Sequence, residues 1–399
     1  MTTDNKTQRF DYIIAGGGLS GLSLAYYLNH STLRNKSVLI IDQDNKTKND
    51  RTWSFWEKGE QNAFESVVHR KWKQVYFYGN GAAKLLHLSP YFYKWMRGID
   101  FYNFVKADLA TNPHITFRQE RIERITDTPD GGFVTTEKGQ YLAQYVFDSV
   151  YALKLNESQN HNMLQHFKGW EISTPKPVFD TQTPIMMDYR VPQRGLGVYF
   201  CYVLPESPTR AMVEHTVFSD ALWPQEQYDA ELTTYLKDVL KISEFKVEQV
   251  EYGVIPMTDE PAPTHVSKHI MRIGTAGGFV KASSGYAFQR TQRFTQQIVE
   301  NLVTVGNPHL PKKTTFKRFK GLLDSTLLNV LLQSRYSGEA VFASLYLKNP
   351  TPRLFAFLDE DTSLWQDLQT MATVPLWAFT KGMLAAVRKR IAPASPPSL

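Results

Sequence analysis

Three glycines near the start of the chain constrain its fold more than any other feature. Gly16, Gly18 and Gly21 follow a short apolar run at residues 12–15 and lead into a segment with helical periodicity at residues 19–28. A second apolar run, residues 37–41, ends in Asp42, which lies 21 residues beyond Gly21. A strand, a glycine turn, a helix and a second strand closed by an acid are what a dinucleotide-binding βαβ unit requires.

Each residue of this turn has its own part in holding a dinucleotide. Gly16 permits the tight turn, Gly18 lets the backbone approach a pyrophosphate, and Gly21 permits close packing of the helix on the strand. The backbone at Gly17 and the start of the helix offers N–H donors and partial positive charge to phosphates. Asp42 is placed to accept from a ribose 2′-hydroxyl, which argues against NADP here. The first turn leaves both FAD and NAD open.

A second glycine turn favours FAD over NAD. Residues 274–278 (GTAGG) follow a short apolar run and precede an expected helix at residues 287–303. In two-domain flavoproteins a turn in this place brings a second set of backbone amides to the flavin end. We therefore expect Gly274 and Gly277 to contact bound FAD, and Ser284 and Gly285 to lie beside its isoalloxazine ring.

The pattern along the chain predicts an α/β protein in three parts. Residues 1–165, completed by residues 266–303, are predicted to form a Rossmann-type FAD-binding domain. Residues 166–265 alternate mostly with period two and are predicted to form a β-sheet substrate domain. Residues 304–399 are predicted to form a helical C-terminal region.

Charge and ligand spacing argue against two kinds of partner. The formal net charge of +6 is mild, and no dense basic-aromatic motif is present, so we expect no nucleic-acid partner. His265 and His269 are four residues apart, but they lie in or just after a proline-rich loop with no third ligand. We therefore expect no metal site.

The same sequence indicates a cytoplasmic protein, soluble or peripheral on a membrane. The single cysteine, Cys201, lies in an apolar run and suits a reducing compartment. No apolar run approaches the roughly 18 residues of a spanning helix. The first nine residues are polar and do not resemble a signal peptide.

Several longer segments resemble the bacterial lycopene β-cyclases. They run in that family's order over about residues 11–303 and comprise GGGLSGLSLA (16–25), NDRTWSFWE (49–57), FDTQTPIMMDYR (179–190), YVLPESPTRAMVEHT (202–216), GVIPM (253–257) and GTAGGFVKASSGYAF (274–288). The helical C-terminal part matches more loosely. Taken together the set is specific, whereas the glycine turn alone would not identify a family.

The resemblance implies a fold shared with FAD-dependent aromatic hydroxylases and geranylgeranyl reductases. It implies FAD held in its reduced form, with NADPH or NADH as the reductant, and lycopene, a linear C40 carotene, as the substrate. Both ends of lycopene would close into β-rings, giving β-carotene by way of γ-carotene without net redox change. The essential glutamate of the family matches Glu214.

Ring closure places demands on that glutamate. An alkene must be protonated, and water must be kept from the carbocation that results. An acid in a dry pocket has a raised pKa, stays protonated at neutral pH and can donate. Glu214 interrupts a period-two strand and is the candidate acid, although the residues alone also allow a solvent-facing strand-end glutamate. Either Glu214 donates the proton, or it stabilises a cation while reduced flavin donates.

Arg51 follows the polar loop after the second strand. It would pair with an FAD phosphate or support the structure on the Glu214 side. Residues 316–332 and 374–391 combine large apolar residues with Lys and Arg. Such amphipathic helices either lie in a membrane interface or pack as a helical cap over the core.

Two other functions remain open from the sequence. A redox flavoenzyme acting on an isoprenoid, a monooxygenase or a prenyl reductase, would share the fold and the glycine turns. Monooxygenases of this group usually carry an Asp-Gly pair after a mid-chain strand, whereas Asp148 is followed here by Ser149. A non-catalytic carotenoid-binding protein is the second alternative, and the intact glycine turns and Glu214 argue against it.

Overall fold

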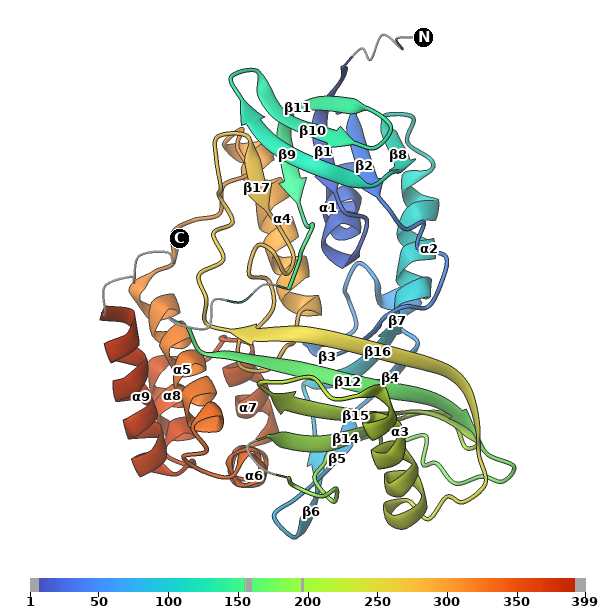
Figure 1. The fold of residues 1–399 in the computed structure, drawn as a ribbon, viewed down its shortest axis with the longest axis vertical. Helices are drawn as coiled ribbons and strands as arrows, with labels where there is room; N and C mark the ends of the chain where they lie inside the picture. The colour runs from blue at the N-terminus through green and yellow to red at the C-terminus, as the bar shows by residue number, and fades with distance from the viewer. Residues whose placement is uncertain (1–6, 154, 156–159, 195–196, 392–399) are drawn as a thin grey trace.

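The computed structural model describes residues 7–153, 155, 160–194, 197–390 and the backbone of residue 391. Two large sheets lie one above the other in Figure 1, and the helices of the C-terminal region stand at the side of the lower sheet. The mixed α/β fold class predicted from the sequence is confirmed.

The first sheet belongs to the nucleotide unit, and its strand order is β8-β2-β1-β11-β10-β9 with β17 paired to β11. Its parallel strands are β1 (Gln8–Ala15), β2 (Val38–Asp42), β8 (Ile115–Gln119), β11 (Gln140–Asp148) and β17 (Ile270–Arg272). The antiparallel strands β9 (Ile122–Thr128) and β10 (Gly131–Thr136) extend it. The second half of β1 and nearly all of β2 are buried, as expected for parallel strands covered on both faces.

Three helices cover this sheet: α1 (Leu19–Asn29), α2 (Gly98–Leu109) and α4 (Phe288–Thr304). Their apolar faces join β1 and β2 in one core that includes Ile14, Leu22, Phe101 and Ile298. β17 and α4 therefore return to the first unit after the chain has built the second sheet.

The second sheet has the order β16-β12-β15-β14-β13-β5-β6. Its long inner strands are β12 (Asn162–Ser173), β14 (Val198–Ser207) and β15 (Arg210–Ser219), and the long strand β16 (Lys246–Thr258) forms one edge. Shorter strands β13 (Ile185–Asp188), β5 (Gln74–Gly79) and β6 (Ala82–His87) complete it. β5 and β6 fall within residues 1–165, the range assigned above to the first unit, yet they pair in the second sheet, because a strand pattern does not reveal its partner.

Different elements cover the two faces of the second sheet. One face packs on α3 (Gln225–Thr234) and the π-helical turn η2 (Tyr235–Val239), and Cys201 is buried there. The other face meets a small sheet of β3 (Thr52–Lys58), β7 (Tyr91–Arg97) and β4 (Arg70–Trp72), next to the short turn η1 (Glu65–Val67). The central strands are consequently buried on both faces.

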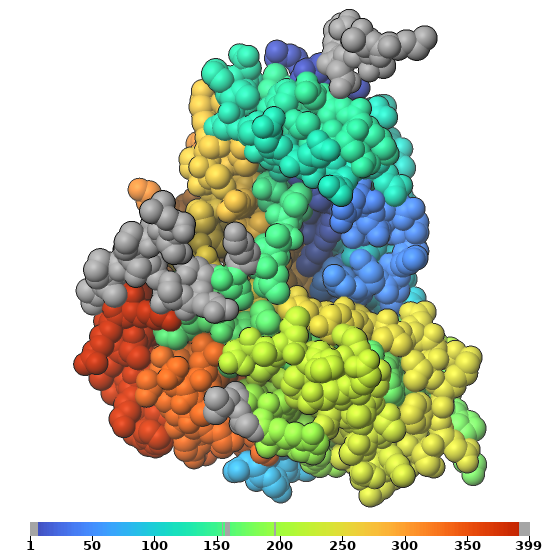
Figure 2. Space-filling view, viewed as in Figure 1, coloured from blue at the N-terminus to red at the C-terminus, as the bar shows by residue number. Residues whose placement is uncertain are grey.

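The helical region packs against this second face. It consists of α5 (Thr315–Leu332), α6 (Gly338–Lys348), α7 (Thr351–Leu358), α8 (Leu364–Met371) and α9 (Leu376–Ile391). Leu328, Phe342 and Phe355 of these helices share one core with β5, β7 and β14. Figure 2 shows the orange and red helical region directly beside the yellow-green part of the chain that builds the second sheet and α3. No helix in the described residues is long and apolar enough to cross a membrane.

Candidate active site

The first glycine turn is shaped as a dinucleotide cradle. Gly16 has φ +105°, a conformation that disfavours side chains, and its N–H donates to the carbonyl of Ile41 at 2.7 Å. A Cβ added to Gly21 would lie 1.9 Å from the carbonyl oxygen of Gly16, so α1 can approach β1 only with glycine here. A Cβ on Gly18 would meet nothing within 4 Å, and Gly18 caps α1 without a side-chain hydrogen bond. The helix N-terminus is thus open to a phosphate.

Asp42 stands at the end of β2 and faces the same turn. Its Oδ2 accepts from the Gly17 N–H at 2.6 Å, and its Oδ1 accepts from the Asp44 N–H at 2.8 Å. Carboxylate oxygens have further lone pairs, so both remain able to accept from a ribose hydroxyl. These residues fit the adenosine half of a dinucleotide.

The second glycine turn lies beside the first. Gly274 has φ +63°, and a Cβ there would lie 2.8 Å from Oγ of Ser20 in the first turn of α1. Ser149 links the two turns, since its Oγ donates to the Ala15 carbonyl at 2.8 Å while a Cβ on Gly274 would lie 3.8 Å from its Cβ. A Cβ on Gly277 would lie 2.4 Å from the Arg272 carbonyl oxygen. The fold therefore brings two turns more than 250 residues apart to one place.

Ser284 and Gly285 belong to a loop that reaches the second sheet. Gly285 has φ +72°, and its added Cβ would lie 2.1 Å from Oε1 of Gln165 on β12. Its N–H donates to the Lys281 carbonyl at 2.9 Å, which closes the loop. Ser284 lines a cavity under the helical region. This loop joins the nucleotide unit to the sheet that carries Glu214.

Glu214 lies on β15 in a row of residues that crosses the second sheet. Strand register places it opposite Tyr202 of β14 and opposite Gly169 of β12, while Gly169 also pairs with Glu251 of β16. Directly opposed residues of antiparallel strands point to the same face. Glu214 and Glu251 therefore project from one face, with a residue that has no side chain between them.

Burial and charge hold Glu214 in its protonated form. Burial and the nearby Glu251 carboxylate raise the pKa of Glu214, and a hydrogen bond from Thr216 lowers it by less. The resulting pKa is about 8. Thr216 Oγ1 donates to Glu214 Oε1 at 2.7 Å, which leaves Oε2 as the atom to carry a proton. The side chain is deep in the protein but only partly covered, as an acid must be if it meets a substrate.

Glu251 is better placed to carry negative charge. Its Oε1 accepts from the backbone N–H of Thr52 at 2.9 Å. Burial raises the pKa of Glu251, and the Thr52 bonds and the Arg51 charge act against that rise. Of the coupled pair, Glu251 has the partners that stabilise an anion, so it ionises before Glu214. Sequence reasoning missed Glu251 and Gly169, because their pattern is that of ordinary strand residues.

Arg51 lies at the edge of this site. Its side chain is exposed, and Nη1 donates to the Asp50 carbonyl at 2.7 Å. Its own carbonyl accepts from the Gly98 N–H at 2.6 Å at the start of α2. The positive charge of Arg51 lowers the pKa of Glu251, and its pairing with an FAD phosphate stays a prediction.

Buried tyrosines surround the row. Tyr93 of β7, Tyr202 of β14, Tyr286 of the 281–286 loop and Tyr346 of α6 are largely buried, and burial raises the pKa of each. Glu214 adds to the rise for Tyr93 and Tyr202, which places these rings near its carboxyl. Their hydroxyls stay protonated, and their ring faces are available to a cation.

A mainly apolar cavity leads from these tyrosines into the helical region. Tyr202, Tyr286 and Tyr346 line its inner end. Apolar side chains of the C-terminal helices line much of the remainder, namely Leu323 and Leu327 of α5, Phe342 and Leu345 of α6, Phe357 and Leu358 of α7, and Met371, Val374 and Phe379 at the α8–α9 connection. Such a wall suits a hydrocarbon and excludes water.

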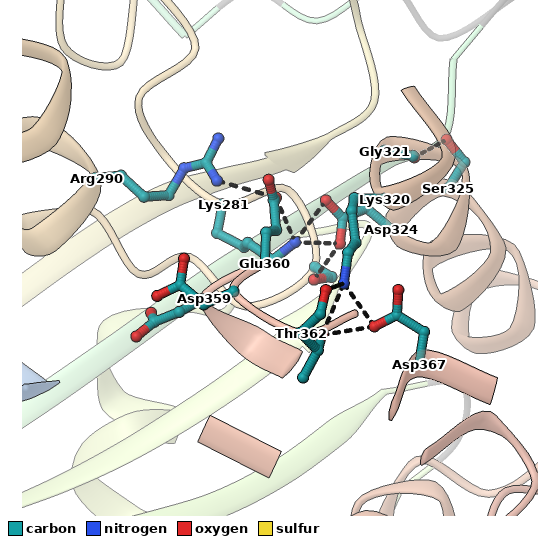
Figure 3. Close-up of polar contacts among 12 residues, drawn as sticks. Lys281, Arg290, Lys320, Gly321, Asp324, Ser325, Asp359, Glu360, Thr362 and Asp367 are labelled. Carbon is teal, nitrogen blue, oxygen red and sulfur yellow. Dashed lines mark hydrogen bonds and ion pairs between the residues drawn. The ribbon is translucent and has the colours of Figure 1, made fainter. Parts of the chain in front are cut away.

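One wall of the cavity is a buried polar seam between the nucleotide unit and the helical region (Figure 3). Lys281 Nζ lies 2.7 Å from Asp324 Oδ1 and 2.8 Å from Glu360 Oε1. Burial raises the pKa of Glu360, but the positive charges of Lys281 and Arg290 lower it by more. The resulting pKa of Glu360 is about 2. Lys320 Nζ lies 2.5 Å from Asp367 Oδ1. These ion pairs tie the 281–286 loop to α5 and to Glu360, just beyond the end of α7, and they tie α5 to α8.

Other residues noted in the sequence have structural surroundings. Arg190 forms an ion pair with Asp188 at 2.6 Å, and the Tyr235 hydroxyl donates to the same carboxylate at 2.7 Å. His269 Nδ1 lies 2.7 Å from Asp127 Oδ1. Within the part of the chain that the structure describes, no group of three or more His, Cys, Asp or Glu is arranged to hold a metal ion.

The fold is that of flavin-dependent oxidoreductases and geranylgeranyl reductase-like proteins. A geranylgeranyl bacteriochlorophyll reductase-like protein from Thermoplasma acidophilum superposes with a TM-score of 0.61 at 12% identity, over 94% of this chain and 98% of that one. A flavoprotein/dehydrogenase from Cytophaga hutchinsonii gives 0.61 at 12% identity, over 95% and 100%. A p-nitrophenol 4-monooxygenase from Pseudomonas putida gives 0.54 at 12% identity, over 96% and 99%.

Sequence comparison narrows this class to one family. The family model described as lycopene cyclase protein matches residues 11–384, and the chain belongs to the lycopene cyclase family. No curated protein matches the chain. The family resemblance drawn from the sequence segments is thereby confirmed.

Proposed function

We propose that this protein is an FAD-dependent lycopene β-cyclase that closes the ends of lycopene into β-rings. The observation that carries the proposal is Glu214, a carboxylic acid whose pKa is raised to about 8 and which lies directly opposite Tyr202, a residue that lines a mainly apolar cavity. Family membership supplies the carotene class of substrate. The reaction adds and removes one proton for each ring, so the product has the mass of the substrate.

Glu214 is the proton donor in this proposal. Thr216 occupies Oε1, so Oε2 delivers its proton to the terminal double bond of the polyene. The tertiary cation that forms is attacked by the neighbouring double bond, and the ring cation then gives a proton back to the Glu214 carboxylate, which leaves the ring neutral and restores the acid. The Glu214 carboxylate and the faces of Tyr93 and Tyr202 lower the energy of the cation while the cavity keeps water away.

FAD fits the two glycine turns of this chain. Gly16, Gly17, Gly18 and Gly21 would hold the pyrophosphate, Asp42 the ribose, and the second turn with Ser284 and Gly285 the flavin end. When bound and reduced, FAD supplies negative charge near the cation. We infer NADPH or NADH as the source of its electrons, and a cytoplasmic location peripheral to a membrane.

Expression in a lycopene-accumulating bacterium tests the proposal. The wild type is expected to convert lycopene into γ-carotene and β-carotene of equal mass, resolved by chromatography and mass spectrometry. Glu214→Gln is expected to lower conversion by about 10³-fold or more while flavin stays bound, because the donor is lost and the turns are intact. A mass gain of oxygen or hydrogen would instead identify a redox enzyme, and lycopene bound without conversion would identify a carrier.

A further inference from the structure

The outer face of the helical region carries an unusual concentration of exposed apolar side chains. Its centre, here called the apolar corner, comprises Leu364, Trp365, Leu368, Leu376 and Trp377 on α8 and the start of α9. Trp365 is 67% exposed, Leu376 62% and Trp377 56%. Tryptophan is costly to leave in water, and here two lie on adjacent helices.

The internal contacts of α8 enforce this orientation. Asp367 is fully buried on the opposite side of the helix, where it accepts from Lys320 Nζ at 2.5 Å and from the Thr362 hydroxyl at 2.6 Å. Thr370 is also buried. Turning Leu364 and Leu368 inward would break the Lys320–Asp367 pair, so the polar seam in Figure 3 holds the apolar side outward.

The charged side chains of α9, next to the apolar corner, are all positive. This helix contains no Asp or Glu, and its charged residues are Lys381, Arg388, Lys389 and Arg390. Lys381 follows Trp377 on the same exposed stripe, with Nζ 5.5 Å from the Trp377 ring centroid. Leu384 and Arg388 continue that stripe. Tryptophan and leucine beside Lys and Arg suit the interface of an anionic bilayer.

The cavity ends directly behind the corner. Met371 of α8, Val374 of the connection and Phe379 of α9 line it from inside, while Leu368 and Trp377, within a turn of them along the chain, face outward. Leu323 and Leu327 of α5 line the cavity as well. The α8–α9 connection is thus the thin wall between the surface and the apolar path to Glu214.

We propose that the apolar corner inserts into an anionic lipid bilayer and that the hydrocarbon substrate enters the cavity between α5 and the α8–α9 connection. The entry route rests on the proposed function, whereas the membrane contact does not. Of the two segments considered from the sequence, residues 374–391 contribute Leu376 and Trp377 to the corner, whereas α5 exposes Phe316 and packs most of its other large apolar residues inward. In Figure 1 α9 forms the outer edge of the helical region, away from α3 and the nucleotide unit.

Flotation of the full chain with liposomes tests the membrane contact. Wild type is expected to float with phosphatidylcholine vesicles that contain phosphatidylglycerol and to float less without it. The variant Trp365→Gln/Leu376→Gln/Trp377→Gln is expected to partition at least about tenfold more weakly. The matched control Val250→Gln/Val305→Gln, which changes two valines that are 57% and 68% exposed elsewhere, is expected to float as wild type.

Charge and entry are tested separately. Lys381→Glu/Arg388→Glu is expected to abolish the gain from phosphatidylglycerol, while Lys246→Glu on β16 is expected to leave it unchanged. Met371→Trp is expected to narrow the path and slow conversion of liposomal lycopene without changing flotation. The corner variant is expected to convert lycopene from detergent micelles as wild type does and to fail with liposomes.

Distinct results would overturn each part. Equal flotation of wild type and the corner variant would contradict the membrane contact. So would sedimentation that shows a dimer of the wild type and a monomer of the corner variant, because the corner would then be a dimer interface. If Met371→Trp slowed the conversion of lycopene from micelles but left the conversion of liposomal lycopene unchanged, the entry route would be contradicted. Flotation that depends on the corner in a protein that does not convert lycopene would leave the membrane contact standing while the proposed function fails.

Discussion

Glu214 and Glu251 lie on one face of the second sheet, each directly opposite Gly169 on the strand between them. Gly169 keeps the space between the two carboxyl groups free, because a Cβ there would lie 2.9 Å from Met212 Sδ and 3.6 Å from Glu214 Cβ. Two buried acids this close do not ionise together with ease. Glu251, bonded to Thr52, takes the charge, and Glu214 keeps the proton.

Glu251→Gln is expected to move the alkaline limb of cyclisation to lower pH. Activity needs protonated Glu214, so it falls as the pH rises through about 8. Removing the neighbouring negative charge lowers the pKa of Glu214, and we expect the limb to shift by about one pH unit. The measurement is the pH profile of kcat with saturating substrate. Glu248→Gln, which changes an exposed residue on the same strand, serves as the control. An alkaline limb at the same pH in Glu251→Gln as in wild type would contradict the coupling of the two carboxyl groups.

Glu214→Gln is expected to stabilise the protein, increasingly so as the pH rises. The folded-state pKa of about 8 exceeds the usual value of 4.5, so the folded state binds more protons than the unfolded state between these values. The free energy of unfolding of the wild type therefore falls as the pH rises through this window. The glutamine variant does not show this fall, because glutamine does not ionise. The pKa difference corresponds to a gain of about 4 kcal/mol near pH 8 and of less than about 1 kcal/mol near pH 5. Urea unfolding at several pH values measures it, and a pH-independent difference would argue against a raised pKa.

Gly21→Ala is expected to abolish nucleotide binding. The added methyl would lie 1.9 Å from the Gly16 carbonyl, so α1 must move away from β1 and the first turn must open. Flavin released from the purified, denatured protein is expected to fall by at least about tenfold. Gly321→Ala is the matched helical control, since its nearest atom would be Arg390 Nη2 at 3.8 Å. Wild-type flavin content in Gly21→Ala would contradict the assignment of this turn.

Lys281→Met is expected to destabilise the protein by about 2–3 kcal/mol, because it removes the cation shared by the partly buried Asp324 and Glu360 and leaves Glu360 with Arg290 alone. Removing Lys281 raises the pKa of Glu360, so in the variant this carboxylate takes a proton as the pH falls. The loss of stability is therefore expected to be smaller at low pH. The exposed pair Lys246–Glu248 provides the contrast, and Lys246→Met is expected to change stability by no more than about 0.5 kcal/mol. Equal effects in chemical unfolding would show that the seam is not a stabilising contact.

The sequence alone determined the nucleotide unit, because its signal is local. Gly16, Gly18, Gly21 and Asp42 sit within one βαβ unit, and backbone geometry leaves few other structures for that spacing. The segment around Glu214 was likewise recognisable as a set of neighbouring residues. What such local patterns do not contain is the partner of each strand and the buried side of each helix.

Tertiary structure decided the rest of the site. The register of β12 with β15 and β16 brings Gly169, Glu214 and Glu251 into one row, although they are far apart in the sequence. Packing also placed β5 and β6 in the second sheet and turned the apolar side of α8 outward through the Lys320–Asp367 pair. Long-range pairing and burial on both faces govern these outcomes, because each depends on contacts that exist only once the chain has folded.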